Sequence, residues 1–322
     1  GEMKRAAAVA LLAMTALPAA LPHAAPSPPP LRGSSAVLID ARTGRPMYAL
    51  GPHVRRPPAS TTKVMTALLV AEAMTPQTLV AISPQASAER SGSAIGLEVG
   101  ERWAAGELMR ALLMHSANDA AVALAEGVAG TSEAFVAQMN ARARALGARD
   151  THFVTPHGRY DPQHYSSAYD LALIARAALT HPWIAKIMRS QTWPLRRGKG
   201  RLLVNTNKLL WRYAGADGVK TGWIAESGPS LIASASRDGW QLIAVVLNSP
   251  QVFDDAAALL DYGFTTFRRM LAGRAGEVVQ VVPVSGAQRP LRAALAEDAA
   301  VVVRQGSTVA SRIEIARTAA PL

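Results

Sequence analysis

The sequence predicts an α+β fold, in which helices flank an antiparallel sheet and a helical subdomain occupies about residues 85–180. Two observations predict it. Short runs rich in β-branched residues, bounded by turn residues, lie near both ends of the region 35–270. Between them, apolar residues recur at spacings of three and four from about Glu107 to Leu179, which is the period of helices. The order of strands, helices, strands and a closing helix indicates an antiparallel sheet with helices packed on it and a helical insertion.

The first predicted strands open the folded region near Ser35. We expect a strand at Ala36 to Ile39, a turn at Asp40 to Gly44 and a returning strand at Met47 to Leu50. Two prolines then end the extended structure, and a long helix is expected to begin near Ser60.

Four helices are expected in the middle of the chain. Ser167 followed by Asp170 is typical of a cap at the start of the last one. The four span Glu107 to Met114, Asp119 to Val128, Ser132 to Leu146 and Ala168 to Thr180.

Strands return after the helices, and a closing helix is expected at Asp254 to Leu271. Arg237-Asp238-Gly239 is a good hairpin turn between the last two strands. The expected strands are Leu202 to Val204, Gly218 to Thr221, Leu231 to Ser236 and Trp240 to Leu247.

After Gly273 the helical pattern gives way to short β-type runs. This change predicts that one large domain, residues 35–273, is followed by a small β-rich segment, residues 274–322. The sequence leaves the role of this segment open. Its β-type runs are Val278 to Val284, Ala300 to Arg304 and Arg312 to Ile315.

The N-terminal residues 1–25 have the layout of a secretory signal peptide. A basic pair at Lys4 precedes an apolar run from Ala6 to about Leu21, and small residues follow around Ala25. A membrane anchor is the alternative, but a proline interrupts the run and its uninterrupted part is short for a bilayer. We therefore expect an exported protein whose proline-rich linker, residues 26–34, precedes the folded region.

Composition narrows the functional classes. The chain has 322 residues, of which 49% are hydrophobic, and no cysteine. It can therefore bury a large core, and it holds no disulfide, thiol nucleophile or thiolate metal site. The net charge of +11 favours an anionic partner, and export argues against nucleic acid. One basic cluster is interpreted as a solvated loop: Arg196, Arg197, Lys199 and Arg201.

A first chemical motif is Ser60-Thr61-Thr62-Lys63, whose ends share one face of a helix. The next eleven residues include a single charged one, so this helix is expected to be buried. Burial lowers the pKa of a lysine, and a serine hydroxyl becomes a nucleophile when a base removes its proton. The motif predicts Ser60 as nucleophile and Lys63 as its base. A capping serine followed by a surface lysine is the alternative.

A second motif is Ser116-Ala117-Asn118, between two predicted helices. A hydroxyl two residues from a carboxamide can point with it into one cleft. Ser116 could then relay a proton and Asn118 could bind a peptide amide. An ordinary capped turn is the alternative.

A third motif is Lys220-Thr221-Gly222, on a predicted strand. A lysine and a hydroxyl there can hold a carboxylate, and a glycine lets a substrate backbone approach the strand. A lysine that faces solvent before a turn is the alternative.

The three motifs together are far more specific than each alone, because order, spacing and setting match the serine enzymes that recognise penicillin. The sequence resembles the low-molecular-weight D-alanyl-D-alanine carboxypeptidases, peptidase family S11, over about residues 35–270. Beyond the motifs, the resemblance rests on Ser93-Ala94-Ile95-Gly96-Leu97, Pro156-His157-Gly158, the stretch from His164 to Leu171, and Asp261-Tyr262-Gly263-Phe264.

This resemblance implies a penicillin-binding-protein fold and, as substrate, peptidoglycan stem peptides that end in D-Ala-D-Ala. Ser60 would attack the carbonyl between the two D-alanines, and the N–H groups of Ser60 and Trp223 would form the oxyanion hole. Thr221 would hold the terminal carboxylate, with Lys220 supporting the field around it and Gly222 beside it. β-Lactams would acylate the same serine, and no cofactor or metal is required.

The signal-peptide layout predicts an extracytoplasmic protein with at most peripheral contact to a membrane or to the anionic cell wall. The sequence leaves the oligomeric state open, and a monomer is the expectation. Two departures from the family pattern stand out. The loop Asn248-Ser249-Pro250-Gln251 lacks an arginine that many relatives use for the substrate carboxylate. The tail Thr318 to Leu322 is too short for an amphipathic anchor, so a soluble or loosely attached enzyme is expected.

Other readings stay open. A D,D-endopeptidase or a β-lactamase would use the same chemistry, and a catalytically idle peptidoglycan-binding protein would use the basic surface. No G-x-S-x-G, H-E-x-x-H or phosphate-binding glycine-rich motif is present. His115, His157 and His164 are interpreted as structural, because a serine–lysine pair needs no histidine.

Overall fold

The computed structural model describes residues 9–17, 27–195, 201–282, 290–296 and 298–316. The chain divides into two compact units: Pro28–Gly263, and the described parts of Gly1–Ser27 with Phe264–Leu322. All eight predicted site residues belong to the first unit. The sequence placed the end of the large domain at Gly273, whereas the division between units falls at Gly263.

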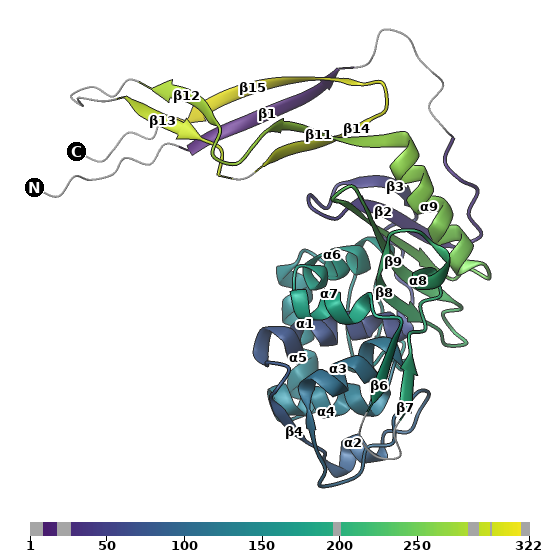
Figure 1. The fold of residues 1–322 in the computed structure, drawn as a ribbon. Helices are drawn as coiled ribbons and strands as arrows, with labels where there is room; N and C mark the ends of the chain where they lie inside the picture. Colours follow the sequence, from purple (N-terminus) through teal and green to yellow (C-terminus); the bar gives the residue numbers. More distant parts are fainter. Residues whose placement is uncertain (1–8, 18–26, 196–200, 283–289, 297, 317–322) are drawn as a thin grey trace, which may run out of the picture. The chain divides into compact units, whose positions relative to one another are not determined.

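A five-stranded antiparallel sheet forms one layer of the Pro28–Gly263 unit, in the order β3-β2-β10-β9-β8 (Figure 1). The predicted antiparallel sheet is confirmed, and in it the early strand β2 pairs with the late strand β10. Asp238 and Gly239 form the predicted hairpin turn between β9 and β10. The strands are β2 (Ser35–Asp40), β3 (Pro46–Leu50), β8 (Ala216–Gly222), β9 (Ser230–Arg237) and β10 (Trp240–Leu247).

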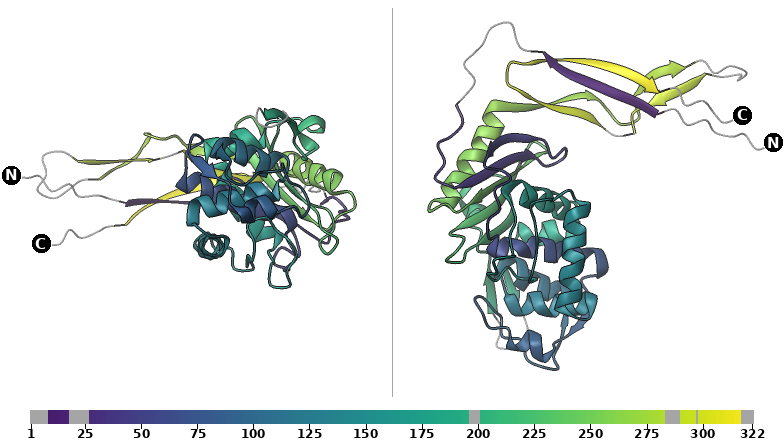
Figure 2. Two further views of the ribbon diagram at one scale, coloured as in Figure 1. Left: turned by 90° about the horizontal axis from the view of Figure 1, so that it is seen from below. Right: turned by 180° about the vertical axis from the view of Figure 1, so that it is seen from behind.

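Helices cover one face of this sheet, where they lie together in both views (Figures 1 and 2). Val37 and Ile39 of β2 belong to the core that these helices share, and α6 packs on β2 and β10. The predicted cap is present, since Ser167 Oγ accepts from the Asp170 N–H at 3.2 Å. The helices are α1 (Lys63–Ala73), α3 (Ala105–Met114), α4 (Asn118–Ala129), α5 (Ser132–Ala145), α6 (Ala168–Leu179) and α7 (Pro182–Met188).

Short elements complete the edges of this unit. The strands β4 and β5 pair with each other, as do β6 and β7. Sequence periodicity does not reveal elements of three to five residues, and of these only the β7 strand was predicted. They are β4 (Leu79–Ala81), α2 (Pro84–Ala88), β5 (Arg102–Ala104), β6 (Thr192–Leu195), β7 (Arg201–Val204) and α8 (Leu209–Arg212).

Helix α9 (Val252–Thr266) packs on the other face of the sheet. A Cβ on its Gly263 would lie 2.5 Å from the Leu242 side chain and 2.8 Å from that of Leu38, so a glycine allows the close approach. The prediction that this helix continues to Leu271 was wrong. Its end at Thr266 is followed by a strand whose partner comes from a distant part of the sequence.

The second unit consists of antiparallel strand pairs in its described residues: β11 with β14, β12 with β13 and β1 with β15. The predicted β character is confirmed there. The strands are β1 (Val9–Leu17), β11 (Phe267–Gly273), β12 (Val278–Val282), β13 (Leu291–Ala294), β14 (Ala299–Arg304) and β15 (Thr308–Ala316).

Strand β1 lies within the predicted signal peptide, which stays a prediction; most of that peptide, the first residue of the linker and the tail Thr318 to Leu322 lie outside the described residues. The same holds for Arg196, Arg197 and Lys199 of the basic cluster. Among the described residues no single helix is long and apolar enough to cross a membrane, and α4 with α5 reaches that length only as a pair bent by 83°.

Candidate active site

Ser60 and Lys63 lie together where a 3-10 turn, η1 (Ala59–Thr62), leads into α1. Lys63 Nζ donates hydrogen bonds to Ser60 Oγ at 2.8 Å and to the His157 carbonyl at 2.7 Å. The Lys63 side chain is fully buried. Burial, and next the nearby charge of Lys220, hold the pKa of Lys63 well below its usual value. The arrangement therefore favours a neutral amine beside a hydroxyl, which is what proton removal from Ser60 requires.

Two glycines allow other parts of the backbone to approach η1 closely. A Cβ on Gly158 would come within 1.8 Å of the Ala59 carbonyl oxygen, and one on Gly222 within 3.0 Å of the Pro58 carbonyl oxygen. Gly158 also has a φ of +91°, and Ala59 one of 50°. Ser60 consequently lies between the end of β8 and the loop around Gly158, with the backbone close on both sides.

The second motif connects α3 to α4. Ser116 has a φ of 65°, a left-handed conformation that non-glycine residues adopt at a cost. The Asn118 side chain donates to the Ser91 carbonyl, and its backbone N–H donates to the Ser93 carbonyl at 2.7 Å. Asn118 thus fixes the loop 91–93 beside the nucleophile, a role that sequence reasoning did not foresee.

The buried Asp119 fastens the next part of the same loop. Its carboxylate accepts from the N–H groups of Ile95, Gly96 and Leu97 at 2.8 to 3.2 Å. Three donors from one turn satisfy a carboxylate that has no access to water. The loop therefore has a defined conformation where it borders the site.

The third motif lies on β8, as predicted. Lys220 is 1% exposed, its Nζ donates to the Thr221 carbonyl at 2.9 Å, and burial lowers its pKa to about 7. The Thr221 hydroxyl lies 2.6 Å from that of Thr206. Trp223 follows the strand and is 67% exposed. Burial thus disfavours the protonated form of Lys220, so this amine is not a permanent cation.

A cavity of about 610 Å³ joins the three motifs. Six of the eight predicted residues line it, while Lys63 and Lys220 lie buried behind its wall. The predicted lining residues are Ser60, Ser116, Asn118, Thr221, Gly222 and Trp223. Other lining residues were not among the predicted site residues, and they include Ser91, Gly92, Ser93, His157, Arg159, Tyr160, Thr206, Lys208, Val252 and Phe253.

The segment Asn205-Thr206-Asn207 brings Thr206 and Lys208 to the cavity. Asn207 Nδ2 donates to the Gly218 carbonyl of β8 at 2.8 Å, and Asn205 is held by its own buried hydrogen bonds. Lys208 Nζ lies 5.9 Å from the centre of the Phe253 ring. In the sequence, the only signal for this wall is a threonine with an asparagine on each side.

The histidines lie in distinct surroundings. Burial lowers the pKa of His157 and of His164 to about 4, and it also lowers that of His115. His164 Nε2 lies 2.9 Å from Thr62 Oγ1, and its Nδ1 accepts from the Val154 N–H at 3.0 Å. His157 contributes its carbonyl to Lys63. These contacts fit the interpretation of His157 and His164 as structural.

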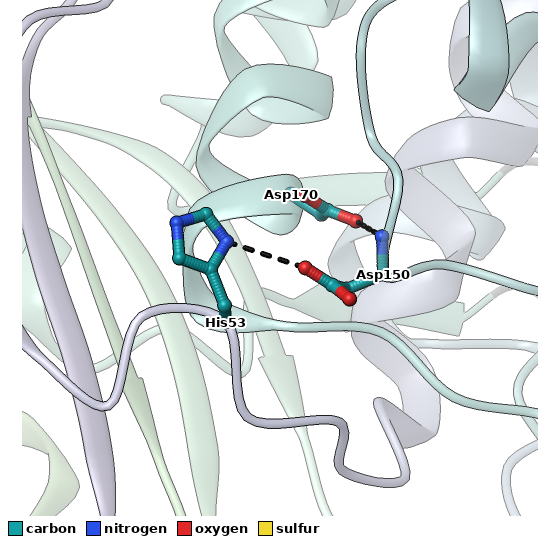
Figure 3. A group of neighbouring side chains, drawn as sticks. All are labelled: His53, Asp150 and Asp170. Atoms are coloured by element: carbon teal, nitrogen blue, oxygen red, sulfur yellow. Dashed lines mark hydrogen bonds and ion pairs between the residues drawn. The ribbon is translucent and has the colours of Figure 1, made fainter.

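A histidine and two aspartates also gather outside the cavity lining, at His53, Asp150 and Asp170 (Figure 3). His53 Nδ1 lies 3.2 Å from the Asp150 carboxylate. Asp170 accepts from the Asp150 N–H and from the Thr151 hydroxyl, both at 2.7 Å, and burial raises its pKa. These oxygens already have donors, so the group fastens the segment 150–151 to α6.

Comparison with known proteins follows this geometry. A family model described as Peptidase_S11, D-alanyl-D-alanine carboxypeptidase, matches residues 23–251. The chain is 35% identical over 282 residues to D-alanyl-D-alanine carboxypeptidase DacF of Bacillus subtilis, which covers 84% of this chain and 72% of the relative. It is 37% identical over 272 residues to D-alanyl-D-alanine carboxypeptidase DacD of Escherichia coli, at 77% and 68% coverage.

Solved structures agree with the sequence relatives. Penicillin binding protein 5 from Haemophilus influenzae has a TM-score of 0.80 at 30% identity, covering 87% of this chain and 85% of that one. Penicillin binding protein 6B from Escherichia coli has a TM-score of 0.75 at 32% identity, with 88% and 87% coverage. The predicted α+β fold is therefore confirmed, and the chain belongs to the serine-type D-alanyl-D-alanine carboxypeptidases of peptidase family S11, the low-molecular-weight penicillin-binding proteins.

Proposed function

We propose that this protein is an exported carboxypeptidase that removes the terminal D-Ala from peptidoglycan stem peptides through an acyl-enzyme on Ser60. The observation that carries the proposal is the 2.8 Å hydrogen bond between Ser60 Oγ and a fully buried lysine whose pKa is held low. A general base needs both the geometry and a pKa that leaves it unprotonated at working pH.

The proposed acylation begins when Lys63 takes the hydroxyl proton and Ser60 Oγ attacks the carbonyl carbon between the two D-alanines. The N–H groups of Ser60 and Trp223 stabilise the oxyanion. As the carbon–nitrogen bond breaks, Ser116 relays a proton to the leaving D-Ala amine. Water then attacks the ester, which releases the shortened peptide and restores the Ser60 hydroxyl.

Substrate binding in this proposal uses the β8 wall of the cavity. Thr221 donates to the terminal carboxylate, and Lys220 adds field when it is protonated. Lys208, which lines the same cavity, supplies a positive side chain, whereas the loop Asn248-Ser249-Pro250-Gln251 has no arginine. Asn118 binds a peptide amide of the retained part.

The test is D-alanine release from diacetyl-Lys-D-Ala-D-Ala by wild type and by Ser60→Ala. The proposal requires release by wild type and none by the variant. No release from a wild-type preparation that still binds fluorescent penicillin would favour a cross-link endopeptidase or a peptidoglycan-binding role instead. Rapid recovery from the penicillin adduct, within seconds rather than minutes, would favour a β-lactamase.

A further inference from the structure

The charged side chains that line the cavity are both cations, Arg159 and Lys208, and the described lining includes no carboxylate. The proposed function uses Lys208, which stands with Thr206 and Phe253, for the terminal carboxylate of the substrate. The proposed function assigns no role to Arg159. A peptide bound in this cavity therefore lies near a second positive charge, that of Arg159, which the proposed binding of its terminal carboxylate does not use.

Arg159 belongs to a loop whose backbone is held beside Ser60 by hydrogen bonds. It follows His157, whose carbonyl accepts from Lys63 Nζ at 2.7 Å, and Gly158, whose N–H donates to Thr155 Oγ1 at 3.1 Å. The Arg159 N–H itself donates to His157 Nδ1 at 3.3 Å. Gly158 of this loop and Gly222 of β8 both lie close to the backbone of η1, and Arg159 lines the same cavity as Thr221 but comes from a different segment of the chain.

The Arg159 guanidinium is exposed and, within the part of the chain that the structure describes, joins no ion pair. Glu89 is close enough for the charge of Arg159 to lower its pKa, but the Glu89 carboxylate is already engaged. One oxygen accepts from the N–H and hydroxyl of Ser91, and the other lies 3.5 Å from His157 Nε2. A guanidinium has five donors in a planar fork that fits a carboxylate. The Arg159 guanidinium is therefore available to bind a carboxylate of a ligand.

We propose that Arg159 is a specificity-determining residue that binds a second carboxylate, carried by the part of the stem peptide that stays on Ser60. This inference rests on the proposed function. It defines the substrate class as a peptide with two anionic groups, one at its C-terminus and one on the retained side. A donor whose second carboxylate is amidated loses the charge that the fork recognises.

The experiment uses two synthetic peptides that end in D-Ala-D-Ala and differ only in a free carboxylate or a carboxamide on the residue before them. Wild type is expected to favour the carboxylate peptide about tenfold in kcat/KM for D-Ala release, as one charge-assisted hydrogen-bonded pair gives. Arg159→Gln is expected to bring the ratio close to one, and Arg159→Lys to keep part of it.

The matched control is Lys208→Gln, which removes the other charged side chain that lines the same cavity. Both peptides should then lose activity alike, with the wild-type ratio retained. The acylation rate with a penicillin that lacks a second carboxylate shows whether each variant is folded, and Arg159→Lys stands in if Arg159→Gln fails this check. A wild-type ratio near one, or a ratio that Arg159→Gln leaves unchanged, overturns the inference. Failure to release D-Ala from either peptide overturns the proposed function instead.

Discussion

Two buried lysines, one at the start of α1 and one on β8, differ in what surrounds an otherwise similar amine. Lys63 Nζ has a hydroxyl oxygen at 2.8 Å and a carbonyl oxygen at 2.7 Å, whereas Lys220 Nζ donates to a carbonyl oxygen at 2.9 Å. Burial is the main cause of the lowered pKa in both. Burial therefore lowers the pKa of both lysines, but Lys63 also has the Ser60 hydroxyl within hydrogen-bond distance, from which its neutral amine can take a proton.

The two regions also differ in how the backbone holds the amine. Lys63 follows the turn η1, which Gly158 and Gly222 approach closely, while Lys220 lies within a β-ladder opposite Ile232. Precise placement at the first region suits proton transfer, which depends on hydrogen-bond geometry. The second region suits a field that acts on a bound carboxylate. Replacing each lysine should therefore damage different kinetic constants.

The largest effect is expected from Lys63→Arg. An arginine stays protonated at any accessible pH, so it cannot take the Ser60 proton. Acylation by fluorescent penicillin should slow about 1000-fold, within the range that general-base catalysis contributes. Lys220→Arg, which keeps the charge on β8, should retain the rate within about tenfold. A Lys63→Arg rate within tenfold of wild type would remove the distinction between the two lysines.

Lys220→Gln should act mainly on substrate binding. Loss of a partly protonated amine beside Thr221 should raise KM for D-Ala-D-Ala peptides about 10- to 100-fold, as expected for a charge-assisted interaction. The value of kcat should change less. Steady-state kinetics of D-Ala release measure both, and a fall in kcat at constant KM would place Lys220 in the chemical step instead.

Gly158→Ala tests the contact that positions the first region. The new Cβ must displace the Ala59 carbonyl and also adopt a φ of +91°, so we expect about 3 kcal/mol lower unfolding free energy and slower acylation. Gly130→Ala is the control, because Gly130 has a φ of +81° but open space around it. It should cost about 1 kcal/mol without slowing acylation. Equal losses in the two variants would mean that strain alone, and not the contact, matters.

Because burial disfavours the protonated form of His164, the unfolding free energy should also depend on pH. Its pKa of about 4 lies below the usual 6.5, so the unfolded chain binds more protons between these values. Unfolding free energy should therefore fall as pH drops from 6.5 towards 4, by about 2 kcal/mol for this residue. Urea unfolding of His164→Asn at pH 7 and 4.5 should show a smaller fall than wild type. The control His181→Asn should match wild type, and a similar match by His164→Asn would contradict the assignment.

The sequence predicted the large elements because their periodicity is strong, and it predicted the motif residues because their spacing is chemically specific. It missed the end of α9. The segment Phe267–Gly273 contains good helix formers, but pairing with Ala299–Arg304 makes it a strand. A partner so distant in the chain has no local signature.

The rest of the cavity wall escaped prediction for a related reason. Arg159 and Lys208 follow loops whose place is set by buried hydrogen bonds from Lys63 and Asn207 to distant carbonyls. Neither residue belongs to a periodic pattern. Spacing within the chain could identify Ser60 with Lys63, since three residues on one helix define their distance, but it could not bring separate loops together.

The most direct measurement is the rate of covalent acylation by a penicillin as a function of pH, with the adduct located by peptide mass spectrometry. We predict an adduct on Ser60, formed at a rate that rises with pH along a single ionisation well below 10.5, as Lys63 loses its proton. An adduct on another residue, or a rate on Ser60 that keeps rising up to the ordinary pKa of lysine, would contradict the account of a neutral Lys63 as the base.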